Sequence, residues 1–476
     1  MGPRQSSAGP ALLTLDSRAG RLALLASILG SAMPFVDGTA VNVALPAMAA
    51  DLGVDFAGFQ WILNAYLIAL AALVLPFGSI ADRWGRRKAF VTGAVGFALA
   101  SLLCGIAPDP GTLIAARALQ GITAALLVPA SLSMIQSGFV PEDRSRAVGI
   151  WSGLSGLSTL IGPLIGGWLV DEVSWRWVFF LNVPVGILAI MVALRSVPAD
   201  QAKKRGPLDT PGAVMAVGML GGLVFGLTQG PVWGWDDPAV MASLVVGALS
   251  TLGFIDAERS GSNPMLPLRF FRRRGFLGAN AVTIGVYFAL SGTFFLLTIQ
   301  MQRVLGYSAF GAGLALSPIT LILLVVSPLA GRWAGSHGPR PALIVGPLVS
   351  AVGALLLSRI GPSADYVTTI LPGVVVWGIG LALTVAPVTS AALASVEASY
   401  SGVAAGVNNA VARAAQLLAV PLLPILAGIA GIETVGGPTF SAGFQAACRV
   451  NAGILLATAL LAFLILERGK AEHLND

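Results

Sequence analysis

The sequence predicts an all-α protein that crosses a membrane about fourteen times. Hydrophobic residues make up 56% of its 476 residues and charged residues only 11%, with a mean hydropathy of +0.83. Soluble domains carry about 25% charged residues. Apolar runs of about 18 to 27 residues recur along the chain, each long enough to cross a hydrocarbon core of about 30 Å as a helix. We therefore expect a polytopic membrane protein without a separate soluble domain.

Run length and the polar breaks between runs define the individual spans. We place them approximately at residues 22–46, 59–80, 90–107, 112–136, 147–170, 177–194, 211–229, 239–256, 276–299, 310–330, 342–358, 368–394, 402–430 and 444–466. With both termini in the cytoplasm, about 22 of the 28 lysines and arginines fall in cytoplasmic segments, as the positive-inside rule requires. The net charge of +6 is thus a topology signal and does not indicate nucleic-acid binding.

An internal repeat divides the chain into two halves. Residues 78–87 (GSIADRWGRR) follow the second expected span, and the similar residues 331–340 (GRWAGSHGPR) follow the tenth. Repeated halves with a site at their interface are the usual plan of secondary transporters. We expect a cytoplasmic tail at 1–21, a six-helix bundle at 22–200, two inserted helices at 201–260, a second six-helix bundle at 261–466 and a cytoplasmic tail at 467–476.

Asp37 lies well inside the first expected span, where an isolated charge costs several kcal/mol and marks a functional site. Its candidate partner is Arg117, because the two lie roughly 13 Å and 7 Å below the outer ends of their spans, a gap that an arginine can bridge. An Arg117 side chain that snorkels to the outer surface is the alternative. Gln120 shares the inward face of Arg117. On a helical wheel Thr39 and Asn42 lie nearly opposite Asp37. We expect Asp37 to face the cavity, and Thr39 and Asn42 to bond to a neighbouring helix.

Further polar side chains inside the spans are candidates for a substrate cavity, together with Gln120. Asn409 and Arg413 share one helix face at i and i+4. Arg413 is near mid-membrane, too deep to snorkel, so it needs a cavity or a polar partner. A purely structural hydrogen bond is the alternative. Asn64 and Tyr66 are weaker candidates, because aromatic residues near a span end usually belong to the interfacial belt.

The loop at residues 78–88 combines glycines, which permit a tight turn, with an acid among several bases. Its candidate residues are Gly78, Asp82, Arg83, Gly85 and Arg86. Charge-assisted contacts at a helix end are the functional interpretation, and positive-inside anchoring alone is the alternative. The second copy at 331–340 lacks the acid, so only the first should act as a strong latch.

The fifth expected span carries small residues at intervals of four. They are Ser158, Gly162 and Gly166, with Pro163 and Gly167 beside them. A stripe of small residues lets two helix backbones approach closely. The spacing alone is as compatible with generic close packing as with a hinge that takes part in movement.

Several chemistries are excluded by missing motifs. The two histidines belong to no H-E-x-x-H motif, and no G-x-x-x-x-G-K-[ST] motif for ATP occurs. We therefore expect no enzyme, no metal and no cofactor, and transport driven by an ion gradient or by the solute's own gradient.

These residues together resemble the major facilitator superfamily, and within it the fourteen-helix drug:proton antiporters. The resemblance covers nearly the whole chain and rests on residues 37–46, 78–88, 117–121, 158–167 and 175–184. It implies the major facilitator fold, alternating access by rocking of two six-helix bundles, proton coupling by Asp37 and Arg117, and an inside gate at the loop between the second and third helices. Relatives that export dicationic compounds often carry further acids in their spans. Apart from Asp37, this sequence has none deep in a span.

The expected function is therefore proton-coupled export of amphipathic organic compounds such as antibiotics or dyes. A dedicated exporter of one metabolite or lipid is the alternative, and a non-transporting receptor or scaffold is a third possibility. We expect a multi-pass monomer in the plasma (inner) membrane, whose partners are small amphipathic substrates, protons and the lipid bilayer, without ATP or nucleic acid.

Overall fold

The computed structural model describes residues 12–198, 209–261, 265–397, 400–432 and 435–466. The first half contains α1 (Arg18–Leu52), α2 (Phe56–Trp84), α3 (Arg86–Gly105), α4 (Pro110–Gly138), α5 (Pro141–Glu172), α6 (Arg176–Phe180) and α7 (Asn182–Ser196). An inserted pair follows, α8 (Thr210–Trp233) and α9 (Pro238–Ser260). The second half contains η1 (Leu268–Arg272), α10 (Arg274–Ile299), η2 (Gln300–Val304), α11 (Ala309–His337), α12 (Arg340–Leu357), η3 (Tyr366–Ile370), α13 (Leu371–Ala394), α14 (Ser401–Leu426) and α15 (Gly437–Ile465).

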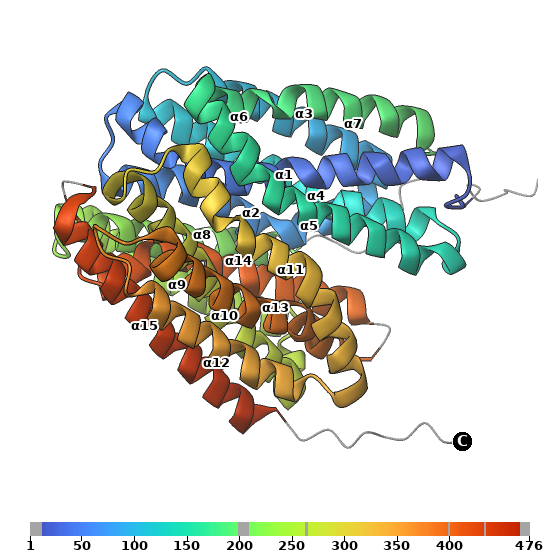
Figure 1. The fold of residues 1–476 in the computed structure, drawn as a ribbon. Coiled ribbons are helices and arrows are strands. Elements are labelled where there is room, and N and C mark those ends of the chain that lie inside the picture. The colour runs from blue at the N-terminus through green and yellow to red at the C-terminus, as the bar shows by residue number, and fades with distance from the viewer. Residues whose placement is uncertain (1–11, 199–208, 262–264, 398–399, 433–434, 467–476) are drawn as a thin grey trace, which may run out of the picture.

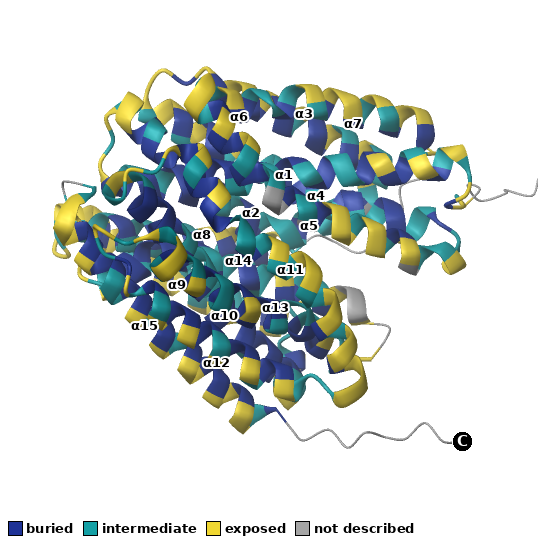
Figure 2. Cartoon of the chain, in the orientation of Figure 1, coloured by how far each residue is buried: buried dark blue, intermediate teal, exposed yellow. Residues whose placement is uncertain are grey.

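The helices form two bundles, one from α1–α7 and one from α10–α15, which lie one above the other in Figure 1. Buried residues face the interior of each bundle, and exposed residues gather on the outside (Figure 2). Many of the exposed side chains are apolar, among them Val325 of α11, Leu464 of α15 and Leu252 of the inserted α9. Such surfaces suit contact with lipid tails. Among the described residues, thirteen helices are long and apolar enough to cross a membrane. The predicted all-α polytopic fold is confirmed.

Each expected span coincides with a helix or a pair of helices. The fifth, at 147–170, lies in α5, a helix of 32 residues that packs between α1 and α11. The sixth, at 177–194, is divided at Leu181 into α6 and α7. The expected domain boundary at 200–201 and the tail at 467–476 lie outside the described residues.

The internal repeat has one shared backbone feature. Gly85 joins α2 to α3 with φ +89°, and Gly338 joins α11 to α12 with φ +81°. Only glycine adopts such angles without strain. The two residues hold equivalent places in the repeated segments, so each half makes the same tight turn.

The inserted helices pack against each other, and α8 also packs against α2 and α14. Leu220 and Val224 of α8 share a buried apolar cluster with Ala71 of α2 and Leu417 of α14. The inserted pair therefore lies beside the seam between the two bundles.

The bundles are joined at one end. We call it the outer end, defined by the connection at residues 53–55, because the topology predicted from the sequence places that connection outside. There Asp171 of α5 accepts hydrogen bonds from the backbone N–H groups of Ala309 (3.0 Å) and Phe310 (2.8 Å), at the start of α11. Toward the opposite, inner end, α5 and α11 diverge in Figure 1, and a Cβ at Gly149 or Gly153 of α5 would have no neighbour within 4 Å.

Candidate functional site

An ion pair lies at the centre of the N-terminal bundle. Nη1 of Arg117, in α4, donates to Oδ2 of Asp37, in α1, at 2.5 Å, and both residues have 0% exposure. Taking two charges out of water costs several kcal/mol per ion, which is offset only by good geometry and by additional hydrogen bonds. The surrounding side chains supply those bonds.

Two amides complete the coordination of the Asp37 carboxylate. Nε2 of Gln120 donates to Oδ1 of Asp37 at 2.7 Å, and Nδ2 of Asn182 donates to the same oxygen at 3.1 Å. Gln120 also donates to Oγ of Ser101 at 2.8 Å and accepts from Arg117 at 2.6 Å. Asp37 thus connects α1 to α4 and α7 through one buried polar cluster, consisting of Asp37, Ser101, Arg117, Gln120 and Asn182.

The remaining contacts of Arg117 come from α2 and α6. Its Nε donates to the carbonyl of Ile62 at 3.1 Å, and its guanidinium lies 4.4 Å from the ring centre of Tyr66 and 5.8 Å from that of Phe179. Gly121 permits this approach, because a Cβ there would lie 2.3 Å from the carbonyl oxygen of Tyr66. The sequence therefore brings α4 close enough to α2 for the arginine to be enclosed by carbonyl and aromatic groups.

The Asp37 side chain points into its own bundle. The opposite face of α1 meets the C-terminal bundle, where Arg413 of α14 lies 5.9 Å from the ring centre of Phe35, and Gln302 donates to the carbonyl of Val43 at 2.9 Å. The expectation that Asp37 faces the cavity between the bundles is therefore wrong. The wheel separates two polar faces correctly, but it contains no information about which neighbour each face meets.

Thr39 and Asn42 also differ from expectation. Oγ1 of Thr39 donates to the carbonyl of Phe35 at 3.0 Å, and Nδ2 of Asn42 donates to the carbonyl of Gly38 at 2.7 Å. These described bonds lie within α1, so the expected bonds to a neighbouring helix are not the ones formed. Backbone carbonyls four residues earlier are always within reach in a helix, and here they satisfy both side chains.

The small residues of α5 face two different helices. A Cβ at Gly162 would lie 2.0 Å from Oγ1 of Thr39 in α1, and one at Gly167 would lie 2.6 Å from Cα of Phe310 in α11. Gly166 is equally close to α1, at 2.7 Å from the Cβ of Ala40. The stripe is therefore where α5 packs tightly on its own bundle and on the partner bundle.

The other two residues of the stripe have simpler surroundings. Oγ of Ser158 donates to the carbonyl of Leu154, one turn earlier in α5, at 3.1 Å. The carbonyl of Pro163 lies against Gly313 of α11, where a Cβ would come within 2.6 Å of it. Pro163 thus belongs to the contact between bundles.

The structure separates the five residues expected to line a cavity. Gln120 belongs to the buried polar cluster, and Tyr66 is stacked on Arg117 with 3% exposure. Asn64 has 0% exposure, and neither its Oδ1 nor its Nδ2 has a partner among the described residues. Asn409 is exposed and Arg413 is half-buried, both on α14.

The expected loop at residues 78–88 is helical apart from Gly85, since residues 78–84 belong to α2 and residues 86–88 to α3. This segment contacts α4. Gly78 packs against α4, and Arg86 donates a hydrogen bond to a serine of α4. Nε of Arg83 is buried without a described partner. Gly85 makes the turn described above, and the side chain of Asp82 lies outside the described residues. These contacts place the loop at the inner end of the N-terminal bundle.

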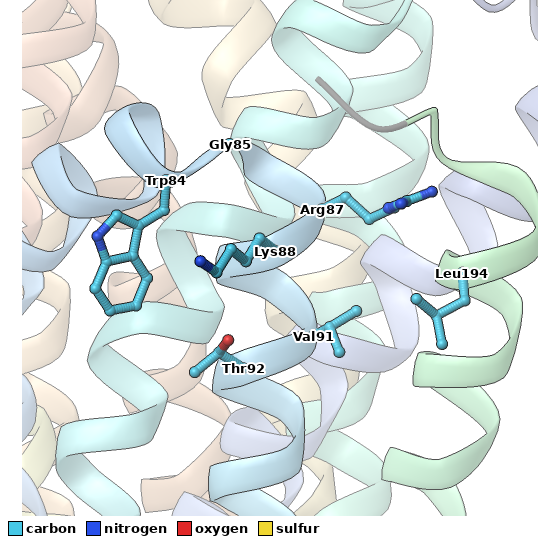
Figure 3. A pocket seen from close by; sticks show the side chains of 7 residues that line it. All are labelled: Trp84, Gly85, Arg87, Lys88, Val91, Thr92 and Leu194. Atoms are coloured by element: carbon cyan, nitrogen blue, oxygen red, sulfur yellow. The ribbon is translucent and has the colours of Figure 1, made fainter. Parts of the chain in front are cut away.

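A pocket opens beside this loop (Figure 3). It is lined by Trp84, Gly85, Arg87, Lys88, Val91, Thr92 and Leu194. Arg87 and Lys88 leave α3 in opposite directions. Nζ of Lys88 lies 5.7 Å from the ring centre of Trp84, and Nη1 of Arg87 donates to the carbonyl of Val197 at 3.2 Å. The pocket lies at the end of the bundle, far along α3 from the buried polar cluster.

The sequence profile of the Major Facilitator Superfamily matches residues 27–421, which run from α1 through the inserted pair into α14. The chain belongs to the major facilitator superfamily. It is 36% identical to the puromycin resistance protein pur8 of Streptomyces alboniger over 91% of this chain and 88% of that protein. It is 34% identical to the multidrug resistance protein Stp of Mycobacterium tuberculosis over 82% of this chain and 72% of that protein.

The fold of this major facilitator protein is also similar to that of a solved transporter of the POT family, with a TM-score of 0.71 at 16% identity, over 95% of this chain and 98% of that one. The chain is thus a multi-pass membrane transporter and not an enzyme.

Sequence reasoning did not identify every member of the transporter's buried cluster. The sequence does contain a signal for Asn182, which is the single polar side chain in the expected span 177–194. The sequence contains no signal for Ser101, because serines in spans usually form hydrogen bonds to the backbone of their own helix. Asp171 was missed because it stands at a helix end, where acids are ordinary.

Proposed function

We propose that this transporter is a drug:proton antiporter of the plasma (inner) membrane, which exports amphipathic organic compounds such as antibiotics or dyes. Support comes from relatives named for resistance to puromycin and to multiple drugs. The transporter works as a monomer with both termini in the cytoplasm, and the proton gradient replaces any cofactor as the energy source.

The observation that carries the proposal is the buried pair of Asp37 and Arg117. A proton on Asp37 removes its charge, so the attraction to Arg117 weakens while Gln120 and Asn182 keep hydrogen-bonding partners. Because the pair connects α1 to α4, its two protonation states favour different helix arrangements, and a proton gradient biases the choice between them.

The other expected residues take supporting roles in this cycle. The tight contacts of Gly162 and Gly166 with α1, and of Gly167 with α11, provide a hinge on which the two bundles rock. Arg83 and Arg86, with Asp82, close the inner end when the outer end opens. Arg413 and Asn409 meet the substrate between the bundles, and Asn64 contributes its unpaired amide once the helices move.

Transport in proteoliposomes tests the proposal. Wild-type protein with an imposed pH gradient should accumulate a dye, and adding the dye should release protons. Asp37→Asn should abolish dye-induced proton release, whereas Asp51→Asn, which changes an exposed acid at the end of the same helix, should keep it. Full proton release by Asp37→Asn would show that the coupling site lies elsewhere.

A dedicated exporter of one metabolite is the second candidate, because the puromycin resistance protein is named for a single antibiotic. A dye panel separates the two functions. A narrow exporter leaves most dyes untransported, whereas a multidrug exporter moves several of unrelated structure.

A further inference from the structure

Arg413 is the feature of the C-terminal bundle that the proton cycle leaves unexplained. It stands in the middle of α14 and is half-buried. Its described partners are weak: Nη1 lies 3.4 Å from Oε1 of Gln416, and the guanidinium lies 5.9 Å from the ring centre of Phe35. A guanidinium has five N–H donors. At this depth most of them have no described acceptor in the protein, although an unpaired charge inside a membrane is costly.

Among the described residues, no carboxylate neutralises Arg413. The sequences of α10 to α15 contain neither aspartate nor glutamate. Across the interface, the acid at the same depth is Asp37, which has 0% exposure and is already paired with Arg117. The middle of the interface therefore carries one positive charge without a counter-ion among the described residues.

The part of α1 opposite Arg413 borders open space. Phe35, Gly38 and Asn42 lie on one face of the helix, at i, i+3 and i+7. A Cβ at Gly38 would meet nothing within 4 Å, and all three residues are only half-buried. This space lies between the bundles, because the same face touches Arg413 at Phe35 and, further along, accepts a hydrogen bond from Arg303 at the carbonyl of Pro46.

We propose that this space, bounded by Phe35, Gly38 and Asn42 of α1 and by Asn409, Arg413 and Gln416 of α14, binds planar aromatic substrates that carry a negative charge. The inference rests on the proposed export function and specifies its substrate class. Arg413 supplies the counter-charge for a carboxylate or an ionised phenol.

The neighbouring groups fit such a substrate. A guanidinium binds carboxylates through paired N–H donors and stacks on flat rings. Phe35 offers an aromatic surface, and the missing side chain at Gly38 leaves room for a ring beside the helix. Asn409 and Gln416 can donate or accept hydrogen bonds at the polar edges of the substrate. A cationic substrate would instead approach an uncompensated positive charge.

Two dyes with one ring system test the charge preference. Fluorescein and rhodamine 123 share a xanthene core, but at pH 8 the first is an anion and the second a cation. Binding of each dye to the purified full-length protein in lipid nanodiscs is measured by fluorescence polarisation, which requires neither a pH gradient nor turnover. The variants are Arg413→Gln, Arg413→Lys and, as a matched control, Arg359→Gln, which removes an exposed arginine between α12 and η3.

Wild-type protein should bind fluorescein at least about tenfold more tightly than rhodamine 123, since a charge-assisted hydrogen bond is worth about one to two decades of affinity. Arg413→Gln should lose that preference, Arg413→Lys should retain part of it, and Arg359→Gln should behave as wild type. Equal binding of both dyes, preference for the cation, no binding of fluorescein, or an undiminished preference in Arg413→Gln would each overturn the inference.

The proposed function has a separate readout. Proton release on addition of either dye to proteoliposomes reports antiport whatever the charge preference. Exchange of rhodamine 123 for protons without binding of fluorescein would support the proposed antiport and refute the proposed site for anions. A protein that binds fluorescein but shows no coupled flux of any compound keeps the site and refutes the antiporter.

Discussion

Replacing Asp37 by asparagine removes the carboxylate but keeps the size of the side chain. In the folded protein the Arg117 guanidinium has 0% exposure. After the substitution it keeps two described hydrogen-bond acceptors, the carbonyl of Ile62 and Oε1 of Gln120. Breaking a buried pair by removing one partner costs about 3 to 5 kcal/mol. Asparagine still accepts from Gln120 and Asn182, so we expect the lower end, about 3 kcal/mol.

The matched variants form a double-mutant cycle. Arg117→Gln alone leaves an unpaired carboxylate and should cost a similar amount, whereas the double variant Asp37→Asn, Arg117→Gln leaves no buried charge. The double variant should therefore be more stable than either single variant, which corresponds to a coupling energy of more than about 3 kcal/mol. Thermal unfolding of the purified protein in detergent measures this energy. A shift of about 6 to 12 °C is expected for each single variant if the N-terminal bundle unfolds as a unit.

The cycle also separates structure from proton coupling. The double variant should regain stability without regaining dye-induced proton release, since it contains no group at this depth that exchanges a proton near neutral pH. Additive destabilisation by the two substitutions would show that the 2.5 Å contact does not couple the residues energetically. Proton release by the stable double variant would refute the assignment of the proton to this pair.

Three further predictions concern helix contacts. Gly166→Ala should lower the free energy of unfolding by about 1 to 3 kcal/mol because its Cβ would meet α1, whereas Gly153→Ala in the same helix should be neutral. Equal thermal midpoints of the two variants would contradict the tight contact between α5 and α1. Asp171→Ala removes the acceptor of two α11 amides and should raise about fivefold the population in which the outer ends of α5 and α11 are separated. Distances between spin labels on α5 and α11 measure this population, with Glu172→Ala as the control. Unchanged distances would count against a role of Asp171 in joining the bundles. Asn182→Leu should slow dye-driven proton exchange about tenfold while keeping the fold, since it removes one hydrogen-bond donor to Asp37. An unchanged rate would show that Asn182 has a structural role and no role in proton exchange.

The spans could be predicted because a membrane imposes a simple length rule on apolar runs. The contact between Asp37 and Arg117 could also be predicted, since their depths followed from the rise per residue and differed by a gap that an arginine side chain can bridge. Gln120 followed from its spacing to Arg117 on a helix. In each case one dimension, the distance along the membrane normal, was enough.

The predictions that failed concern the rotation of each helix about its own axis and the identity of its neighbours in the plane of the membrane. The sequence placed Asp37 and Asn42 on opposite faces of one helix, but the rotation of that helix is set by packing against α4, α5 and α7. The same limit hid Ser101, whose hydroxyl accepts from Gln120 across a helix boundary. Asn64 was predicted as a weaker cavity candidate, yet no pattern in the sequence indicates that both of its amide atoms lack described partners in this arrangement.

The placement of Asp37 and Arg413 on opposite sides of α1 has an electrical consequence. In the proposed transport cycle the proton and the substrate bind to separate groups, so binding one does not neutralise the other. When an anion leaves the cell as a proton enters, two elementary charges move in the same electrical sense during each turnover. A membrane potential of 100 mV, negative inside, would then add about 4.6 kcal/mol to the driving force, at about 2.3 kcal/mol per charge. Export of an acidic compound by this protein would continue on voltage alone, even where the pH is equal on the two sides of the membrane.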